Sequence, residues 1–223
     1  MARILLVNAS FEPVSLMMAS EKNRTGVKTS ANSHYPLGTA YLHSFLENQA
    51  HTVKSLFLNS YSYDDCFKTV ADTIQSFKPN IVGFQILTSN RVSTYQLLEY
   101  VHENYPDIKI IIGGIHTTIM YEQLLKKFPF AIAVLGEGEI TFAELAKNLF
   151  QSNADLREVD GIAFNKNGSL VTTKTRDLIE NLDDLPFPKH DIFLEDGKRT
   201  SACLLTTRGC PFSCSFCCLD VIS

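Results

Sequence analysis

Short apolar runs alternate with amphipathic segments along the first 150 residues. Most of the runs are continuously apolar, which is typical of strands buried on both faces of a parallel sheet. Strands are expected at residues 2–8, 53–58, 81–84, 108–112 and 131–135, and helices at residues 37–46, 64–77, 91–104, 118–128 and 141–150. Because parallel strands are joined by right-handed crossovers, these repeats predict an α/β fold with a doubly wound five-stranded parallel sheet.

The alternation ends near residue 151. Residues 160–164 and 169–172 flank a turn that contains glycine, which predicts a β-hairpin. Residues 174–199 combine two prolines with a surplus of acids, as in an extended connector. A further strand is expected at residues 203–206. The expected domain organisation is 1–150 for the sheet domain, 151–199 for the hairpin and linker, and 200–223 for the start of another domain.

The predicted topology points to one edge of the sheet. In doubly wound sheets, ligands bind beyond the carboxyl ends of the strands, near the point where the strand order reverses. The loops at that edge are residues 8–38, 59–64, 85–90, 113–117 and 135–139. We therefore expect any ligand site of the sheet domain to be built from these loops.

Composition and charge exclude some classes of protein. The chain is 45% hydrophobic and 20% charged, with a formal net charge of -4, so it lacks the basic excess that is typical of nucleic-acid binders. No apolar run approaches the roughly 20 residues that span a bilayer, and the first apolar run is too short for a signal-peptide core. We expect no nucleic-acid partner, no membrane span and a cytoplasmic location.

The cysteines gather near the end of the chain. Cys210, Cys214 and Cys217 have the spacing C-x3-C-x2-C. Three thiolates can hold an iron–sulfur cluster and leave one iron of a cubane without a protein ligand. Structural zinc is the first alternative, but it usually uses paired C-x2-C knuckles or added histidines. A disulfide framework is the second, but the first 200 residues contain only Cys66.

The residues around these cysteines resemble the radical S-adenosylmethionine (SAM) superfamily. Arg208 and Gly209 precede the first cysteine, and Phe216 precedes the third. The resemblance implies that a [4Fe-4S] cluster binds here and that its open iron chelates SAM. It also implies that one electron cleaves SAM to a 5′-deoxyadenosyl radical, so an electron donor of the flavodoxin or ferredoxin type is an expected partner.

The whole chain resembles the cobalamin (B12)-binding radical SAM enzymes. The resemblance is carried by Pro-Leu-Gly at 36–38, Gly-Gly-x-His at 113–116, Gly-Glu-Gly-Glu at 136–139 and Leu-Pro-Phe-Pro at 185–188, all ahead of the cysteines. It implies a Rossmann-like, B12-binding sheet domain, followed by the first strand and cluster loop of a partial (β/α) barrel. We therefore expect the chain to be the N-terminal part of a longer enzyme.

The resemblance also assigns candidate cofactor-binding residues. Glycines let the backbone approach the nucleotide tail of the corrin closely, and hydroxyl, imidazole and carboxylate groups can hydrogen-bond it. The candidates are Gly38, Thr88, Ser89, Gly113, Gly114, His116, Gly136, Glu137, Gly138 and Glu139. An equal alternative for Glu139 is that it is an acid at the start of a helix, where the helix dipole favours it. The alternative for Gly113 and Gly114 is that two adjacent glycines simply form a common structural turn.

Histidine usage departs from that of many cobalamin carriers. These place Asp-x-His-x-x-Gly after the second strand, where the histidine binds cobalt, whereas residues 59–64 contain no histidine. His116 is interpreted as a loop residue that contacts the tail or caps the next helix, in preference to a cobalt ligand. His34, in the long first loop, is a candidate to approach the corrin. The other histidines are expected at the surface or in the linker: His43, His51, His102 and His190.

Several functions are compatible with this resemblance. The first is a methyltransferase that uses cobalamin, SAM and the cluster to methylate an unactivated carbon of a small-molecule substrate; relatives that catalyse cyclisation or rearrangement keep those outcomes open. In the second, the sheet domain no longer binds cobalamin and serves in substrate recognition. The third is a stand-alone corrinoid-binding module, since this chain by itself is expected to be inactive.

The ligand assignment predicts the effect of one substitution. Cys214→Ala is expected to abolish cluster assembly, because two remaining thiolates cannot hold three irons of a cubane. Iron and sulfide content after anaerobic reconstitution measures this, with Cys218→Ala as the control because Cys218 fits no ligand position. A fully reconstituted cluster in the Cys214→Ala protein would contradict the assignment.

Overall fold

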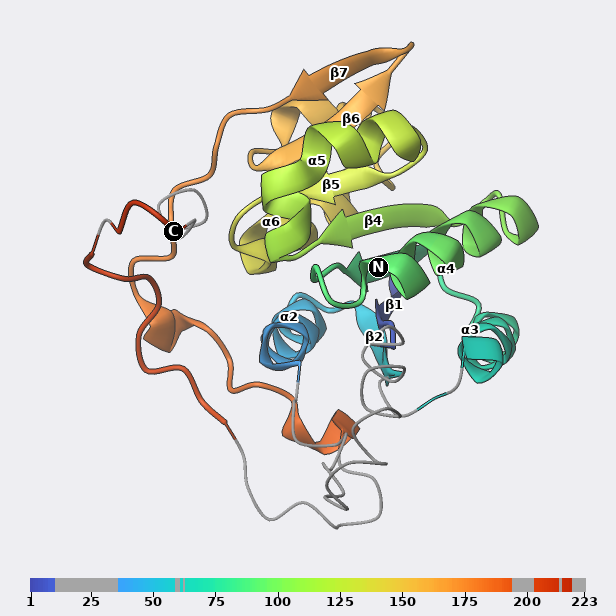
Figure 1. Ribbon diagram of the computed structural model, residues 1–223, viewed down its shortest axis with the longest axis horizontal. Coiled ribbons are helices and arrows are strands. Elements are labelled where there is room, and N and C mark those ends of the chain that lie inside the picture. The colour runs from blue at the N-terminus through green and yellow to red at the C-terminus, as the bar shows by residue number, and fades with distance from the viewer. Residues whose placement is uncertain (11–35, 59–60, 62, 194–202, 213, 218–223) are drawn as a thin grey trace.

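Seven strands form a single sheet in the order β2-β1-β3-β4-β5-β6-β7 (Figure 1). The computed structural model describes residues 1–10, 36–58, 61, 63–193, 203–212 and 214–217, and His34 lies outside these ranges. The strands are β1 (Arg3–Asn8), β2 (Thr52–Phe57), β3 (Ile81–Gln85), β4 (Lys109–Gly113), β5 (Ile132–Val134), β6 (Ile162–Lys166) and β7 (Ser169–Thr172). The helices are α2 (Leu37–Asn48), α3 (Tyr63–Phe77), α4 (Arg91–Asn104), α5 (Ile115–Lys127) and α6 (Gly138–Asn148).

The expected five parallel strands are confirmed. β1 pairs in parallel with both β2 and β3, and the parallel pairing continues through β4 to β5. The expected hairpin, β6 and β7, is also present, and it extends the same sheet because β6 pairs antiparallel with β5. The strand order reverses between β1 and β3, which is the switch point of this topology.

The helices divide unequally between the two faces of the sheet. One hydrophobic cluster packs α3, α4 and α5 against one face, with Val70, Leu97 and Leu124 among its buried residues. The other cluster packs α2 and α6 against the opposite face through Leu46 and Leu145. The second face therefore has only two helices over five parallel strands. Within the described part of the chain, no helix is both long and apolar enough to cross a membrane.

Three expected boundaries or elements differ from the structure. α5 begins at Ile115, three residues earlier than expected, because Gly114 at φ 95° turns the chain directly out of β4. α6 likewise begins at Gly138. The strand expected at residues 203–206 is wrong, since these residues are described without regular structure. A strand needs a hydrogen-bonded neighbour, whereas the N–H of Leu205 donates to the hydroxyl of Tyr41 at 3.3 Å.

The expectation that His43 lies at the surface is also wrong. His43 is on α2 and only 2% exposed, and its Nδ1 lies 2.8 Å from Oγ of Ser55 on β2. Its Nε2 lies 3.4 Å from Oε1 of Glu47. Burial lowers the pKa of His43 below its ordinary value, although the neighbouring Glu47 acts in the opposite direction. The folded protein therefore favours the neutral imidazole.

This shift predicts a pH dependence of stability. Because the unfolded chain binds the proton more readily, the free energy of unfolding should fall as the pH drops from about 6.5 towards the folded pKa, by at most about 1.4 kcal/mol per pH unit from this group. Urea unfolding between pH 5 and pH 8 measures the slope, with His43→Gln as the comparison. The contribution of His43 is refuted if the two proteins have the same slope.

Candidate cofactor-binding site

A cavity of about 780 Å³ opens at the carboxyl edge of the sheet. Its walls come from the ends of the parallel strands, from α2 and from the start of α6, for example Leu42 and Phe142. Residues 178–183 of the linker and residues 205–209 complete the wall. Ligand clefts measure roughly 300–1,000 Å³ and are mostly apolar with a few polar groups, so the size and lining of this cavity are those of a ligand site.

The floor of the cavity is a row of residues across three adjacent strands. Leu6 of β1 is the register partner of Gly83 of β3, and Gly83 is the partner of Ile111 of β4. All three line the cavity. A β-carbon at Gly83 would lie 3.0 Å from both Leu6 and Phe142. Glycine at this position therefore lets the side chains of Leu6 and Phe142 pack directly over β3 at the floor of the cavity.

Polar side chains form a group at the carboxyl ends of β1 and β3. Nδ2 of Asn8 donates to Oε1 of Gln85 at 2.5 Å, and the hydroxyl of Thr39 on α2 donates to the same oxygen at 3.3 Å. Gln85 and Thr39 line the cavity. Oδ1 of Asn8 is buried and accepts no hydrogen bond from the described residues. A buried amide oxygen without a donor is costly, so this region is suited to a ligand with hydrogen-bond donors.

The predicted glycines lie in the cavity wall, but they have different roles. A β-carbon at Gly114 would lie 2.9 Å from the carbonyl oxygen of Ile86, and φ there is 95°. Gly114 is therefore required by the backbone itself. At Gly113 and Gly138 a β-carbon would meet only Val134, at 3.8–3.9 Å, and at Gly136, with φ 69°, it would meet nothing within 4 Å. These three glycines leave open space that faces the cavity.

Gly38 lies at the start of α2, on the opposite wall. A β-carbon there would lie 3.4 Å from Nε2 of Gln85. The polar group at the end of β3 is therefore in van der Waals reach of the first turn of α2. Gly38 belongs to the cavity lining, as expected from the sequence.

The structure separates Thr88, Ser89 and His116 from the other candidates. None of the three is among the residues that line the cavity. Oγ1 of Thr88 lies 3.1 Å from Nδ1 of His116, and the hydroxyl of Tyr95 lies 2.9 Å from Nε2. Burial lowers the pKa of His116, and the charge of Arg91 lowers it further. Both ring nitrogens are engaged within the protein, and His116 lies in the first turn of α5, not in the loop where the sequence placed it.

Glu137 and Glu139 contact the C-terminal segment. Oε1 of Glu137 lies 2.9 Å from Nη1 of Arg208, and Oε1 of Glu139 lies 2.7 Å from Nη2. Oε2 of Glu137 accepts a hydrogen bond from the N–H of Ile179 at 2.6 Å. Glu139 is also in the first turn of α6, where the helix dipole favours an acid.

Sequence reasoning missed the linker wall and these pairings. Residues 178–183 carry no binding motif, and their role follows only from their place over the cavity. Arg208 carried a weak signal, because it directly precedes the glycine and first cysteine of the cluster motif.

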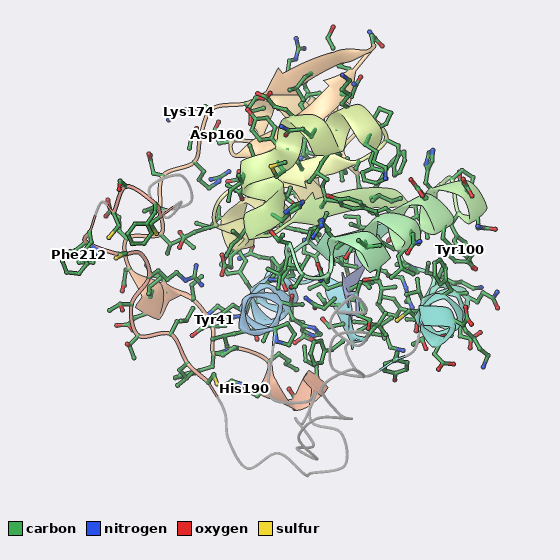
Figure 2. The ribbon with its side chains drawn as sticks, viewed as in Figure 1. Tyr41, Tyr100, Asp160, Lys174, His190 and Phe212 are labelled. Atoms are coloured by element: carbon green, nitrogen blue, oxygen red, sulfur yellow. The ribbon has the colours of Figure 1, made fainter. Side chains whose placement is uncertain are left out.

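The three predicted cluster ligands lie in an exposed loop. Cys210, Cys214 and Cys217 are free thiols, and the N–H of Cys217 donates to the carbonyl of Cys214 at 2.9 Å in a tight turn. Figure 2 shows Phe212 of this loop at the periphery, away from the sheet. Within the described residues no group of three or more His, Cys, Asp or Glu side chains is arranged to hold a metal ion. Metal-binding loops commonly take their final form only with the metal, and thiolates at this spacing have the chemistry that iron–sulfur clusters require.

Fold and cavity together define a class of protein. It is a doubly wound α/β domain with a ligand cavity at the switch point between β1 and β3. Residues 23–146, more than half of the chain, match the model of the B12 binding domain. The chain belongs to this B12-binding domain family, as the sequence motifs predicted.

The curated relatives include methyltransferases and cyclases. An uncharacterized methyltransferase of Pyrococcus horikoshii is 33% identical over 82% of this chain and 40% of its own length. The anaerobic magnesium-protoporphyrin IX monomethyl ester cyclase of Rubrivivax gelatinosus is 35% identical over 82% of this chain and 34% of its own. The cobalamin-dependent radical SAM methyltransferase TokK of Streptomyces tokunonensis is 27% identical over 63% and 22%. The chain therefore spans less than half the length of each relative.

Solved structures share the fold. The cobalamin-dependent S-adenosylmethionine radical enzyme OxsB, with aqua-cobalamin and S-adenosylmethionine bound, superposes with a TM-score of 0.67 at 20% identity, over 86% of this chain and 24% of that one. The radical S-adenosylmethionine methyltransferase TsrM of Kitasatospora setae gives a TM-score of 0.59 at 20% identity, over 78% and 30%.

The contrast between the adjacent Gly113 and Gly114 predicts that valine destabilises the protein much more at one position than at the other. Gly114→Val should lower the free energy of unfolding by more than about 2 kcal/mol, because a β-branched residue at positive φ is strained and its β-carbon would meet a backbone oxygen. Gly113→Val should change it by less than about 1 kcal/mol, because valine suits a strand and finds open space. Chemical unfolding measures both. Equal destabilisation of the two variants would refute the distinction.

Proposed function

We propose that the protein binds cobalamin in the cavity between α2 and α6, and that the cysteine loop binds a [4Fe-4S] cluster and SAM. The complete enzyme then methylates an unactivated carbon of a small-molecule substrate. The observation that carries the cobalamin proposal is the position of the cavity. It lies at the switch point and continues along the sheet in a domain of the B12-binding family. Such a cleft accommodates a flat macrocycle at the edge and its nucleotide tail along the strands.

The residues of the cavity fit this cofactor. Open space at Gly113, Gly136 and Gly138 allows a large ligand to come close to the backbone. The corrin side chains are rich in amide groups, which match the amide of Gln85 in the cavity wall. The apolar floor supplies contact area for the tail. No histidine is among the described residues that line the cavity.

The cysteine loop fits a cluster by its donor set. Cys210, Cys214 and Cys217 would supply three thiolates, which leaves the fourth iron for SAM. When bound, the cluster and SAM supply radical chemistry, and cobalamin supplies methyl-group chemistry. The part of this chain is to bind both groups, to hold them at a fixed separation and to keep water from the space between them.

Methyl transfer is proposed because relatives with that activity recur. Methyltransferases from Pyrococcus horikoshii, Streptomyces tokunonensis and Streptomyces wedmorensis are among them. The relatives also include anaerobic magnesium-protoporphyrin IX monomethyl ester cyclases, which keeps cyclisation as the alternative outcome. An electron donor of the flavodoxin or ferredoxin type is part of the proposal, because cluster reduction requires a one-electron source.

Hydroxocobalamin binding tests the cofactor site. The wild-type protein should bind it and shift the absorption bands of the corrin. Gly113→Val should weaken binding at least about tenfold, since its methyl groups would occupy the cavity at a cost above roughly 1.4 kcal/mol.

Ser169→Val is the matched control, because it adds valine to the exposed edge strand β7 outside the cavity. Wild-type affinity in the Gly113→Val protein would contradict the placement of the cofactor. Absence of hydroxocobalamin binding to the wild-type protein would refute the function itself.

A further inference from the structure

Arg208 joins the cysteine loop to the wall of the cavity. It lies two residues before Cys210 in the chain, yet its guanidinium group pairs with Glu137 and Glu139, which are 71 and 69 residues away. The N–O distances are 2.9 and 2.7 Å, one from each terminal nitrogen. A rigid planar fork that meets two separate carboxylates fixes both the position and the orientation of the arginine.

The burial of this group separates it from ordinary surface ion pairs. The side chain of Arg208 is 21% exposed, and those of Glu137 and Glu139 are 15% and 6% exposed. Burial by itself would lower the pKa of Arg208, but hydrogen bonds and charge from Glu139 and Glu137 raise it above its ordinary value. Ion pairs that are shielded from water and hydrogen-bonded at both ends hold their geometry better than exposed ones do.

A second helix holds the same segment. The guanidinium carbon of Arg208 lies 5.4 Å from the centre of the Tyr41 ring on α2, within the range of a cation–π contact. The hydroxyl of Tyr41 also accepts the hydrogen bond from the N–H of Leu205. Figure 2 shows Tyr41 on the side of α2 where the C-terminal segment passes. Residues 205–208 are thus held by α2 and by the start of α6, the two helices that border the cavity.

Glu137 also binds the linker that lies over the cavity. One carboxylate oxygen of Glu137 binds Arg208, and the other accepts from the N–H of Ile179. Residues 178–183 and 205–209 both form part of the cavity wall. Residues 136–139, which lead from β5 into the first turn of α6, therefore connect three parts of the site: the sheet edge, the linker wall and the segment that leads into the cysteines.

We propose that Arg208 is a positioning residue that holds the three-cysteine loop at a fixed place beside the cobalamin cavity, through Glu137 and Glu139. The inference rests on the proposed function, in which two cofactors act on one substrate. Such a reaction needs a constant separation between them, because a displacement of about 1 Å can cost a hundredfold in rate. Since residues 205–209 are part of the cavity wall, loss of the pairing should also loosen the cavity.

The absence of tryptophan from the sequence makes a clean probe available. Phe212→Trp, in the cysteine loop and 69% exposed, introduces a single tryptophan, whose fluorescence can be excited selectively over that of the tyrosines. Its anisotropy decay in the cofactor-free protein reports motion of the loop relative to the whole molecule. In the Phe212→Trp protein, the parent of the variants below, we expect the slow anisotropy decay of overall tumbling to dominate. When Arg208→Gln is added, we expect the amplitude of this slow decay to fall and that of fast local motion to rise.

Further variants separate positioning from general stabilisation. Glu137→Gln should also increase the fast local motion of the introduced tryptophan, as Arg208→Gln does, because it weakens the same ion pair from the side of the carboxylate. Arg208→Lys should restore the slow decay in part, since an ammonium group keeps the charge but cannot span both carboxylates. Arg176→Gln is the matched control, because Arg176 pairs with Glu144 on the same helix, and neither residue lines the cavity. It should leave the decay unchanged.

The outcomes distinguish this inference from the proposed function. An Arg208→Gln protein with wild-type circular dichroism and the anisotropy decay of the parent would overturn the positioning role, whether or not cobalamin binds. So would an equal change in the Arg176→Gln control. In the hydroxocobalamin titration, Arg208→Gln should lower affinity roughly tenfold, and unchanged affinity would overturn the link to the cavity. Failure of the parent itself to bind would refute the proposed function, while the anisotropy comparison would stand.

Discussion

The handedness of parallel crossovers determines where this protein has room for a ligand. With the strand order β2-β1-β3-β4-β5, right-handed connections put α3, α4 and α5 on one face and leave α2 and α6 to cover the other. Among the strands, helix α2 contacts β2 and β1 and helix α6 contacts β5, and the two helices also contact each other. The carboxyl ends of β3 and β4 between them are incompletely covered, and the cavity lies there. The strand reversal thus produces both the fold and its binding site.

Glycine acts in this site in two physical ways that the residue type alone does not distinguish. At Gly114 the backbone has a positive φ and approaches the carbonyl of Ile86, so the absence of a side chain serves the turn from β4 into α5. At Gly83 the absence of a side chain lets Leu6 and Phe142 pack over the strand, and at Gly113 it leaves open space in the cavity wall. A motif such as Gly-Gly-x-His therefore combines a structural requirement with a ligand-related one in adjacent residues. His116, at its end, faces Thr88 and Tyr95 outside the cavity.

The acidic pair in the last βα loop connects the sheet domain with the segment that carries the cysteines. Glu137 and Glu139 could have faced a ligand, and in the structure their carboxylates meet the guanidinium of Arg208. Charges this far from water need a partner, and Arg208, in the segment that leads to the cysteines, provides one. The arrangement gives two parts of the chain that are distant in the sequence a common point of attachment.

The sequence by itself determined the α/β class, the five parallel strands, the hairpin, the edge of the sheet at which the cavity lies and the family, because hydrophobic periodicity and short glycine and cysteine motifs are local signals. It also named Gly38, Gly113, Gly136 and Gly138 as part of the site. Only the tertiary structure decided that the hairpin extends the sheet, that residues 203–206 form no strand and that His43 is buried beside Ser55. It alone brought Arg208 to Glu137 and Glu139 and laid residues 178–183 along the cavity. These facts depend on which segments meet across long stretches of chain, and such meetings follow from packing and hydrogen bonding in three dimensions, which no local pattern encodes.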